Sequence, residues 1–123
     1  MKKKIKVSNL SQYIDKIYQK ADGFAYIING KICGLIVGYI SNRYTDDVYI
    51  ALFGVDSKYR KNGIGKKIMQ EFLSHVPEEC SIETNVDSEN KVALSAYTSY
   101  GFEIIGEQDG RLTIKTNKTN CNI

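Results

Sequence analysis

The sequence has no tryptophan, one proline and one histidine, and only three cysteines in 123 residues. Cys33, Cys80 and Cys121 are odd in number and lack C-x-x-C spacing, so neither a disulfide framework nor a zinc site is indicated. We expect free thiols and no bound metal. No apolar run approaches the length of a membrane span, and no signal-peptide apolar block follows the basic start at Lys2–Lys4. We therefore expect a cytoplasmic protein that makes no membrane contact.

Charge and composition limit the function further. The formal net charge of +3 is too small to indicate nucleic-acid binding, although it suits a small polyanionic ligand. With 42% hydrophobic and 25% charged residues, the chain is expected to form one domain over residues 1–123 with a real core. Residues 116–123 are polar, and we expect them to form a loose tail.

Apolar periodicity predicts an α/β protein. Leu10, Tyr13, Ile14 and Ile17 follow the spacing of one helical face, and Asn29-Gly30 between two β-rich runs is typical of a type I′ hairpin. The remaining expected elements are a strand at 46–55, a helix from Ile64 that Pro77 ends, a strand at 80–86, a helix at about 89–100 capped by Asp87 or Ser88 and followed by Gly101, and a closing hairpin through Asp109-Gly110. This order predicts an antiparallel start and a parallel contact where a helix crosses over.

The stretch "YRKNGIGKKI", residues 59–68, is the strongest functional signal. Gly63 and Gly65 allow positive φ and close backbone approach, and a helix that starts there directs unpaired N–H groups outward, which favours an anion such as phosphate. A Walker A loop would need glycine in place of Arg60 and serine or threonine in place of Lys67. A dinucleotide-binding loop would need glycine in place of Ile68, so both patterns fail.

The remaining pattern, Arg-x-x-Gly-x-Gly from Arg60 to Gly65, resembles the acyl-CoA pyrophosphate loop of the GNAT superfamily of N-acetyltransferases. A second stretch, "NKVALSAYTSYGF" from Asn90 to Phe102, is similar to the other GNAT signature. The resemblance covers roughly residues 21–115. It implies a mixed, mostly antiparallel central sheet with flanking helices, splayed like a V with coenzyme A in the split, and a shortened N-terminal helical region.

The resemblance also implies acetyl-CoA as cosubstrate and a primary amine as acceptor. Main-chain groups of Phe53 and Val55 would pair with the pantetheine arm, Gly54 would allow a local distortion, and a nearby N–H would stabilise the oxyanion. The residues expected to bind the pyrophosphate, through the loop backbone and its positive field, are Arg60, Lys61, Asn62, Gly63, Ile64, Gly65 and Lys66, with Lys67 adding charge.

By the same resemblance, Tyr97 donates a proton to the leaving thiolate, and Asn90 hydrogen-bonds the pantetheine or a nearby backbone group. The identity of the general base stays open. Relatives with a glutamate base often carry it five residues before the asparagine, where this chain has Asn85. The candidates, each of which would act through water, are Glu83, Asp46 and Asp47.

Each feature also has an ordinary structural explanation. The glycines can be turn residues, Tyr97 a core tyrosine and Asn90 a helix cap, but their joint spacing favours the acyl-CoA site. His75 is expected at the surface near a helix end, and Cys33 and Cys80 as small buried strand residues.

Two other classes of function are considered. One is a catalytically idle domain of this fold that senses coenzyme A or docks to a partner. The other is a nucleic-acid binder, which the lack of aromatic and basic interleaving disfavours. The acceptor is open: a small amine, a protein terminus or an amino sugar on a carrier fits, and a homodimer could complete the wall of the site.

Overall fold

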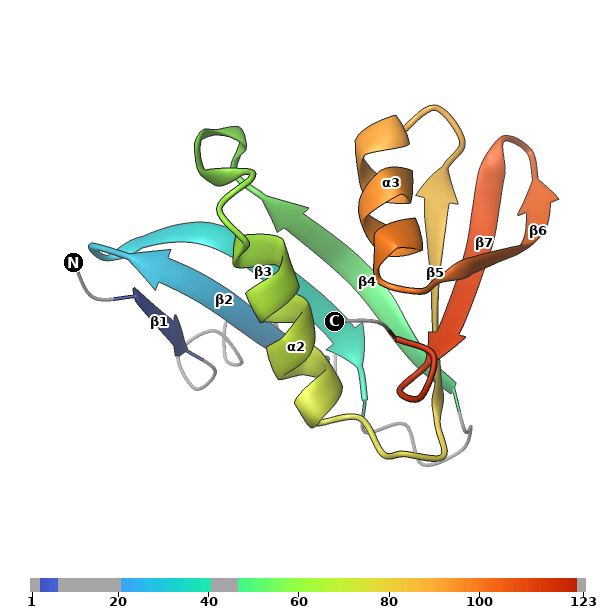
Figure 1. Cartoon of the computed structure of the whole chain (residues 1–123), viewed down its shortest axis with the longest axis horizontal. Coiled ribbons are helices and arrows are strands. Elements are labelled where there is room, and N and C mark those ends of the chain that lie inside the picture. Colours follow the sequence, from blue (N-terminus) through green and yellow to red (C-terminus); the bar gives the residue numbers. More distant parts are fainter. Residues whose placement is uncertain (1–2, 7–20, 41–46, 122–123) are drawn as a thin grey trace. The chain divides into compact units, whose positions relative to one another are not determined.

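The strands and helices alternate as the apolar periods predict. The computed structural model describes residues 3–6, 21–40 and 47–121, so the predicted helical face from Leu10 to Ile17 lies outside it, and so does Asp46. The elements are, in chain order, β1 (Lys3–Lys6), β2 (Asp22–Ile28), β3 (Lys31–Tyr39), β4 (Asp47–Val55), the 3₁₀ turn η1 (Ser57–Tyr59), α2 (Ile64–Ser74), β5 (Ser81–Asp87), α3 (Lys91–Ser99), β6 (Glu103–Gln108) and β7 (Arg111–Asn117) (Figure 1).

The strands follow the order β1-β2-β3-β4-β5-β7-β6 in one sheet. The pairs β1–β2, β2–β3, β5–β7 and β6–β7 are antiparallel, whereas β4 and β5 are parallel and are connected through α2. This confirms the predicted mixed, mostly antiparallel sheet. The elements form two compact units: the first holds β1, β2, β3, α2 and β4 from Ile50 onward, and the second holds the start of β4, β5, α3, β6 and β7.

Both predicted hairpin turns have the backbone of a type I′ turn. Asn29 and Gly30 have φ values of 50° and 80°, and Asp109 and Gly110 have values of 53° and 79°. Two successive positive φ values match the right-handed twist of the flanking strands, which explains why asparagine or aspartate followed by glycine occurs at these positions. The two hairpins are confirmed.

In the first unit, the apolar face of α2 packs on β2 and β3 (Figure 1). Its buried residues recur at helical spacing, and the Phe72 ring meets the Phe24 ring edge-on, with centroids 6.1 Å apart. Gly34 in β3 lets the helix come close, since a Cβ there would lie 2.5 Å from Ile68 Cδ1 and 3.2 Å from Ile64 Cγ2. The missing side chain therefore sets the distance between the sheet and the first turns of α2.

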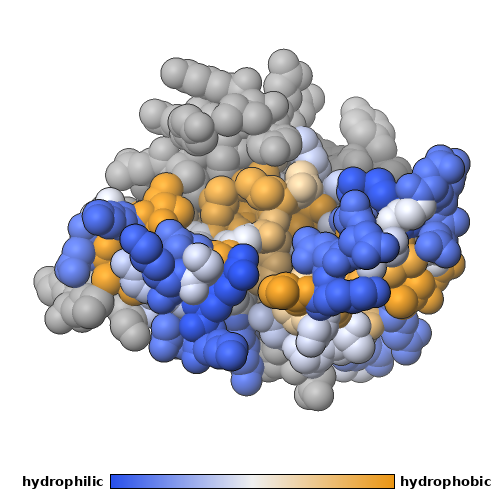
Figure 2. Space-filling view, turned by 90° about the horizontal axis from the view of Figure 1, so that it is seen from above, coloured by the Kyte–Doolittle hydropathy of each residue, from blue (hydrophilic) through white to orange (hydrophobic). Residues whose placement is uncertain are grey.

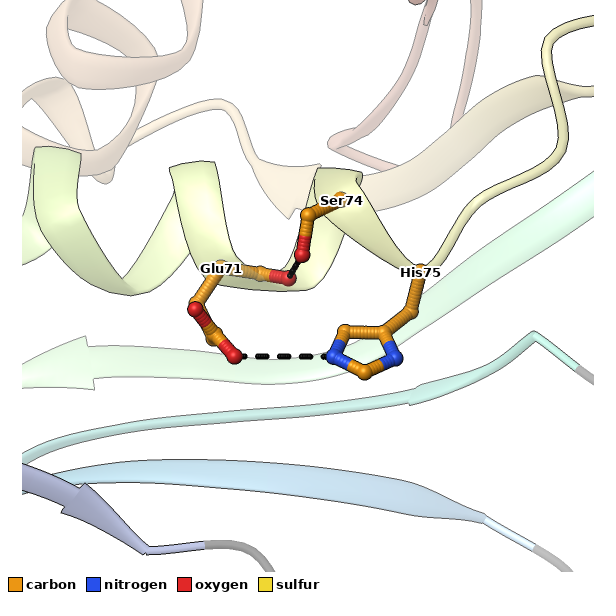
Figure 3. A network of polar contacts seen from close by, with 3 residues as sticks. All are labelled: Glu71, Ser74 and His75. Carbon is orange, nitrogen blue, oxygen red and sulfur yellow. Dashed lines mark hydrogen bonds and ion pairs between the residues drawn. The ribbon is translucent and has the colours of Figure 1, made fainter.

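The C-terminal end of α2 is closed by local polar contacts (Figure 3). His75 Nε2 lies 3.5 Å from Glu71 Oε1, and the Ser74 hydroxyl donates a hydrogen bond to the Glu71 carbonyl oxygen at 2.6 Å. The His75 ring also lies 4.8 Å from the Phe24 ring, centroid to centroid. Half of the His75 side chain is exposed, as expected for a surface residue at a helix end.

In the second unit, β5 alternates between two faces. Ile82, Thr84 and Val86 are buried, while the residues between them are only half-buried. β7 runs through Asn117, and Thr116 is buried and pairs with Ile82. The loose tail predicted from residue 116 therefore begins too early, because the last strand extends two residues into it.

Candidate active site

The glycine loop leads directly from β4 into α2. β4 ends at Val55, as predicted, and Gly63 is the N-cap of α2 with φ 75° and no side-chain cap. The first intrahelical bond runs from Lys67 N to Gly63 O at 3.1 Å, so the N–H groups of Ile64, Gly65 and Lys66 precede it and have no acceptor within the helix. This is the arrangement that binds phosphate at a helix N-terminus.

The roles of the two glycines differ from the prediction that both provide positive φ. Gly63 does so, but Gly65 is the second residue of α2 and is helical. The other positive φ in the loop is that of Lys61, at 67°. A Cβ on Gly63 would meet no protein atom within 4 Å, so the space above it is open on the protein side.

Two loop side chains brace the loop itself. Arg60 Nε donates to the Val55 carbonyl oxygen at 3.2 Å, and Asn62 Nδ2 donates to the Tyr59 carbonyl oxygen at the same distance. These bonds tie the loop to the end of β4 and close it on itself. The structure therefore gives Arg60 and Asn62 a part in shaping the loop backbone.

Positive charge gathers around this loop. Between residues 56 and 67 the chain has one acidic side chain, Asp56, and five exposed basic ones: Lys58, Arg60, Lys61, Lys66 and Lys67. Figure 2 looks at the molecule from the side on which the loop joins β4 to α2. The residues of the loop are mostly hydrophilic in this view. Lys67 Nζ lies 5.9 Å from the centre of the Tyr26 ring. The resulting field favours an anion without requiring a contact from each lysine.

Cys33 lies beneath the loop and is buried, as predicted. Its carbonyl oxygen accepts a hydrogen bond from Asp56 N at 2.8 Å. Interaction with the Cys33 thiol, by charge and by hydrogen bond, raises the pKa of Tyr59. Cys80 is half-buried and precedes β5 rather than lying within it, and all three cysteines are free thiols.

Tyr97 lies on α3 in the second unit and is 5% exposed. Burial raises the pKa of Tyr97 well above the usual tyrosine value, and a hydrogen bond with the Thr84 side chain opposes this increase. Nearby Tyr100 and Tyr49 raise it slightly more. The hydroxyl is protonated at neutral pH, as for any tyrosine, and burial makes it a weaker acid than an exposed tyrosine.

The two ends of α3 hold Tyr97 in place. Asn90 is the N-cap, and its side-chain Oδ1 accepts a hydrogen bond from Ala93 N at 3.2 Å. The predicted caps, Asp87 and Ser88, are wrong: Asp87 Oδ1 accepts from Glu89 N and Ser88 N donates to a backbone carbonyl, so both belong to the preceding turn.

The C-terminal end of α3 forms a Schellman motif around the predicted Gly101, whose φ is 103°. Phe102 N donates to the Tyr97 carbonyl oxygen and Gly101 N donates to the Thr98 carbonyl oxygen, both at 3.0 Å. The Phe102 ring packs edge-on against the Tyr97 ring, with centroids 5.0 Å apart. The backbone and the ring of Tyr97 are thus fixed by the same turn.

The face of β5 opposite to the buried Ile82, Thr84 and Val86 carries a polar network. Asn85 Nδ2 donates to the Tyr49 hydroxyl at 3.0 Å, and the Thr113 hydroxyl donates to Asn85 Oδ1 at 2.9 Å. Glu83 belongs to this face, because it alternates with Thr84, whose side chain bonds Tyr97. The candidate base Glu83 and the candidate acid Tyr97 therefore lie on opposite faces of β5.

Asp47, the other described candidate base, is already engaged. Its carboxylate lies 3.6 Å from Lys115 Nζ and accepts a hydrogen bond from the Ser81 hydroxyl. These contacts hold the Asp47 carboxylate against Lys115 and Ser81.

Thr84 was missed by the sequence analysis. The alternation of Ile82, Thr84 and Val86 with polar residues places Thr84 on the buried face, and this signal could have identified it. Its link to Tyr97 could not be read from spacing, because the two residues lie on different elements.

Among the described residues, no group of histidine, cysteine, aspartate or glutamate side chains could hold a metal ion. Within the same ranges, no helix is long and apolar enough to cross a membrane.

Comparison with known proteins identifies the family. The family model of the acetyltransferase (GNAT) domain matches residues 2–115. This match agrees with the mixed sheet and with the helix N-terminus that follows a glycine loop. The chain therefore belongs to the GNAT acetyltransferase domain family.

The relatives include acetyltransferases with different acceptors in their names. The chain is 28% identical over 98 residues to the spermine/spermidine N(1)-acetyltransferase of Bacillus subtilis (strain 168), a match that covers 75% of this chain and 64% of that protein. It is 41% identical over 58 residues to human N-alpha-acetyltransferase 30, covering 44% of this chain and 16% of that protein. The chain thus spans less than two thirds of the length of these relatives.

Among solved structures, Ard1 from Thermoplasma volcanium superposes with a TM-score of 0.69 and 27% identity, covering 89% of this chain and 78% of that one. This similarity agrees with the family match and with the predicted GNAT fold.

Proposed function

We propose that this domain transfers the acetyl group of acetyl-CoA to a primary amine by direct attack in a ternary complex. The observation that carries the proposal is the N-terminus of α2, where the N–H groups after Gly63 have no acceptor in the helix and basic side chains surround them. The family uses acetyl-CoA as acetyl donor, and the pyrophosphate of coenzyme A is the anion expected at this site.

Binding of acetyl-CoA is assigned to two neighbouring segments of the first unit. The loop backbone from Lys61 to Lys66 would cradle the pyrophosphate. Main-chain groups of Phe53, Gly54 and Val55 would follow the pantetheine arm and polarise the thioester carbonyl. In this proposal Asn90 uses its side-chain amide NH₂ group, since its Oδ1 caps α3.

The chemistry balances as an acyl transfer. The amine nitrogen attacks the thioester carbonyl carbon, a C–N bond forms, and the carbonyl electron pair moves onto oxygen. The tetrahedral intermediate collapses with cleavage of the C–S bond, and Tyr97 donates its proton to the thiolate. The amine loses its proton to a water molecule, and the carboxylate that receives it stays open among the candidates, since Glu83 lies on the face of β5 opposite to Tyr97.

The deciding experiment measures acetyl-CoA-dependent thiol release with a panel of amines. Spermidine, a short peptide with a free N-terminus, the same peptide with a blocked N-terminus and an amino sugar separate the acceptor classes. Turnover with any free amine supports the proposal. Tight acetyl-CoA binding with no turnover on the panel would favour the idle, coenzyme-sensing alternative.

A further inference from the structure

α3 has little apolar surface that could fix it on the sheet. Of the nine residues in this helix, all of them described, Tyr97 alone is buried. The candidate proton donor is therefore also the main apolar anchor of its own helix. A group that transfers a proton has to be held within about 0.5 Å of its working position, which calls for a further contact that fixes the end of α3.

Thr116 of β7 supplies such a contact. Its hydroxyl donates a hydrogen bond to the carbonyl oxygen of Gly101 at 3.0 Å, just beyond the end of α3. The same hydroxyl lies 3.4 Å from the Asn117 carbonyl oxygen, and since it has one proton, the shorter bond to Gly101 is favoured. Thr116 is buried, and valine would fill its place with almost no change in volume, so its hydroxyl needs a specific partner.

Gly101 belongs to the turn that holds Tyr97. The next residue, Phe102, donates its N–H to the Tyr97 carbonyl oxygen at 3.0 Å, and its ring packs edge-on against the Tyr97 ring. The bond from Thr116 therefore ties to β7 the turn that contacts both the backbone and the ring of Tyr97. Because Thr116 and Gly101 are 15 residues apart in the sequence, this bond joins a strand to a helix end, which local capping cannot do.

From this arrangement we infer that Thr116 is a positioning residue, which holds the end of α3 against β7 and so fixes where the Tyr97 hydroxyl lies. The inference rests on the proposed role of Tyr97 as proton donor. Loss of the Thr116 hydroxyl should slow the step that needs Tyr97. It should leave coenzyme affinity unchanged, since we assign that affinity to the loop before α2.

Two substitutions at position 116 separate the hydroxyl from the packing. Thr116→Val removes the hydroxyl and keeps the shape, whereas Thr116→Ser keeps the hydroxyl and removes a methyl group. We expect Thr116→Val to lower kcat about 3- to 10-fold, the range for loss of one neutral hydrogen bond, with KM for acetyl-CoA unchanged. Thr116→Ser should recover most of the rate.

Amide hydrogen exchange reports the state of the turn independently of activity. In Thr116→Val, the N–H groups of Gly101 and Phe102 should exchange about 3- to 10-fold faster than in wild type, relative to the amides of β5. Thr113→Val is the matched control, because Thr113 lies on the same strand but donates to Asn85 Oδ1 at 2.9 Å. In this control, the two amides should exchange as in wild type.

The double variant Thr116→Val, Tyr97→Phe distinguishes failure of this inference from failure of the proposed function. If Thr116 acts through the Tyr97 hydroxyl, the double variant has the same kcat as Tyr97→Phe alone. Unchanged kcat in Thr116→Val, or an equal loss with and without the Tyr97 hydroxyl, overturns the positioning role. Wild-type turnover in Tyr97→Phe overturns the donor assignment, and unchanged exchange in Thr116→Val shows that its hydroxyl does not hold the turn.

Discussion

The glycine loop and the surroundings of Tyr97 differ in the atoms that they offer to a ligand. The loop offers backbone N–H groups at the start of α2, and the lysines around it are exposed and redundant. Tyr97 offers one hydroxyl, buried and held by Thr84, Phe102 and the end of α3. Binding should therefore be sensitive to backbone shape and tolerant of side-chain loss, whereas catalysis should depend on single atoms.

The largest effect is expected from Gly63→Val. Valine at φ 75° is strained by about 1–2 kcal/mol, and its side chain would enter the open space where a phosphate must approach. Calorimetry should detect no binding of acetyl-CoA, while circular dichroism still reports a folded protein.

Gly30→Val is the matched control for backbone strain. Gly30 has φ 80° and equally open surroundings, but it lies in the hairpin turn between β2 and β3. It should lower the melting temperature and retain acetyl-CoA affinity. Wild-type affinity in Gly63→Val would contradict the assignment of the loop.

Tyr97→Phe should reduce kcat by about 10²- to 10⁴-fold, because the ring and its packing on Phe102 remain while the proton donor is lost. Affinity for acetyl-CoA should be unchanged within a factor of about two. The measurement is steady-state thiol release with an acceptor identified from the amine panel. Loss of coenzyme binding instead would make Tyr97 a structural residue.

Because Tyr97 is buried, the protein should become less stable at alkaline pH. The native pKa is raised above the ordinary value of 10.0, so above about pH 10 the unfolded chain releases this proton while the native state keeps it. The unfolding free energy therefore falls as pH rises, with a slope that approaches about 1.4 kcal/mol per pH unit.

Urea unfolding between pH 9 and pH 11.5 measures this slope in wild type and in Tyr97→Phe. Burial also raises the pKa of Cys121, to about 11, and of Tyr100, so only the difference between the two proteins reports Tyr97. Equal slopes in both would mean that Tyr97 titrates normally.

The smallest effect is expected from Lys67→Ala. The Lys67 ammonium lies over the Tyr26 ring, and other exposed lysines maintain the field at the loop. Affinity for acetyl-CoA should fall about two- to fivefold at low salt and less at high salt. Lys31→Ala, on β3 of the same unit, is the control, and a loss as large as that of Gly63→Val would contradict the backbone mode of binding.

Local signals in the sequence were sufficient for much of this fold. Asparagine or aspartate before glycine predicted both hairpins, and Gly101 predicted the end of α3, because each depends on the backbone preferences of adjacent residues. The same local reasoning failed at the start of α3. Asp87, Ser88 and Asn90 are all good caps, and the choice of Asn90 was decided by the turn that joins β5 to the helix.

The site divides along similar lines. The shape of the glycine loop could be predicted because it depends on consecutive residues, although the helical conformation of Gly65 required knowledge of where α2 begins. The contact of Thr84 with Tyr97 and the network of Asn85 with Tyr49 and Thr113 join residues from different elements. No spacing rule specifies such contacts, since they depend on how strands and helices pack.

The glycine at position 34 connects the core to the start of α2, which we propose as the coenzyme site. An alanine there would push against Ile64 and Ile68, and Ile64 is the first residue of α2. Ile68 is fully buried, so its terminal methyl has little room to turn away, and the strain would reach the first turns of α2. A mutational screen for altered coenzyme affinity should therefore recover position 34, and a search confined to surface residues around the loop would overlook it.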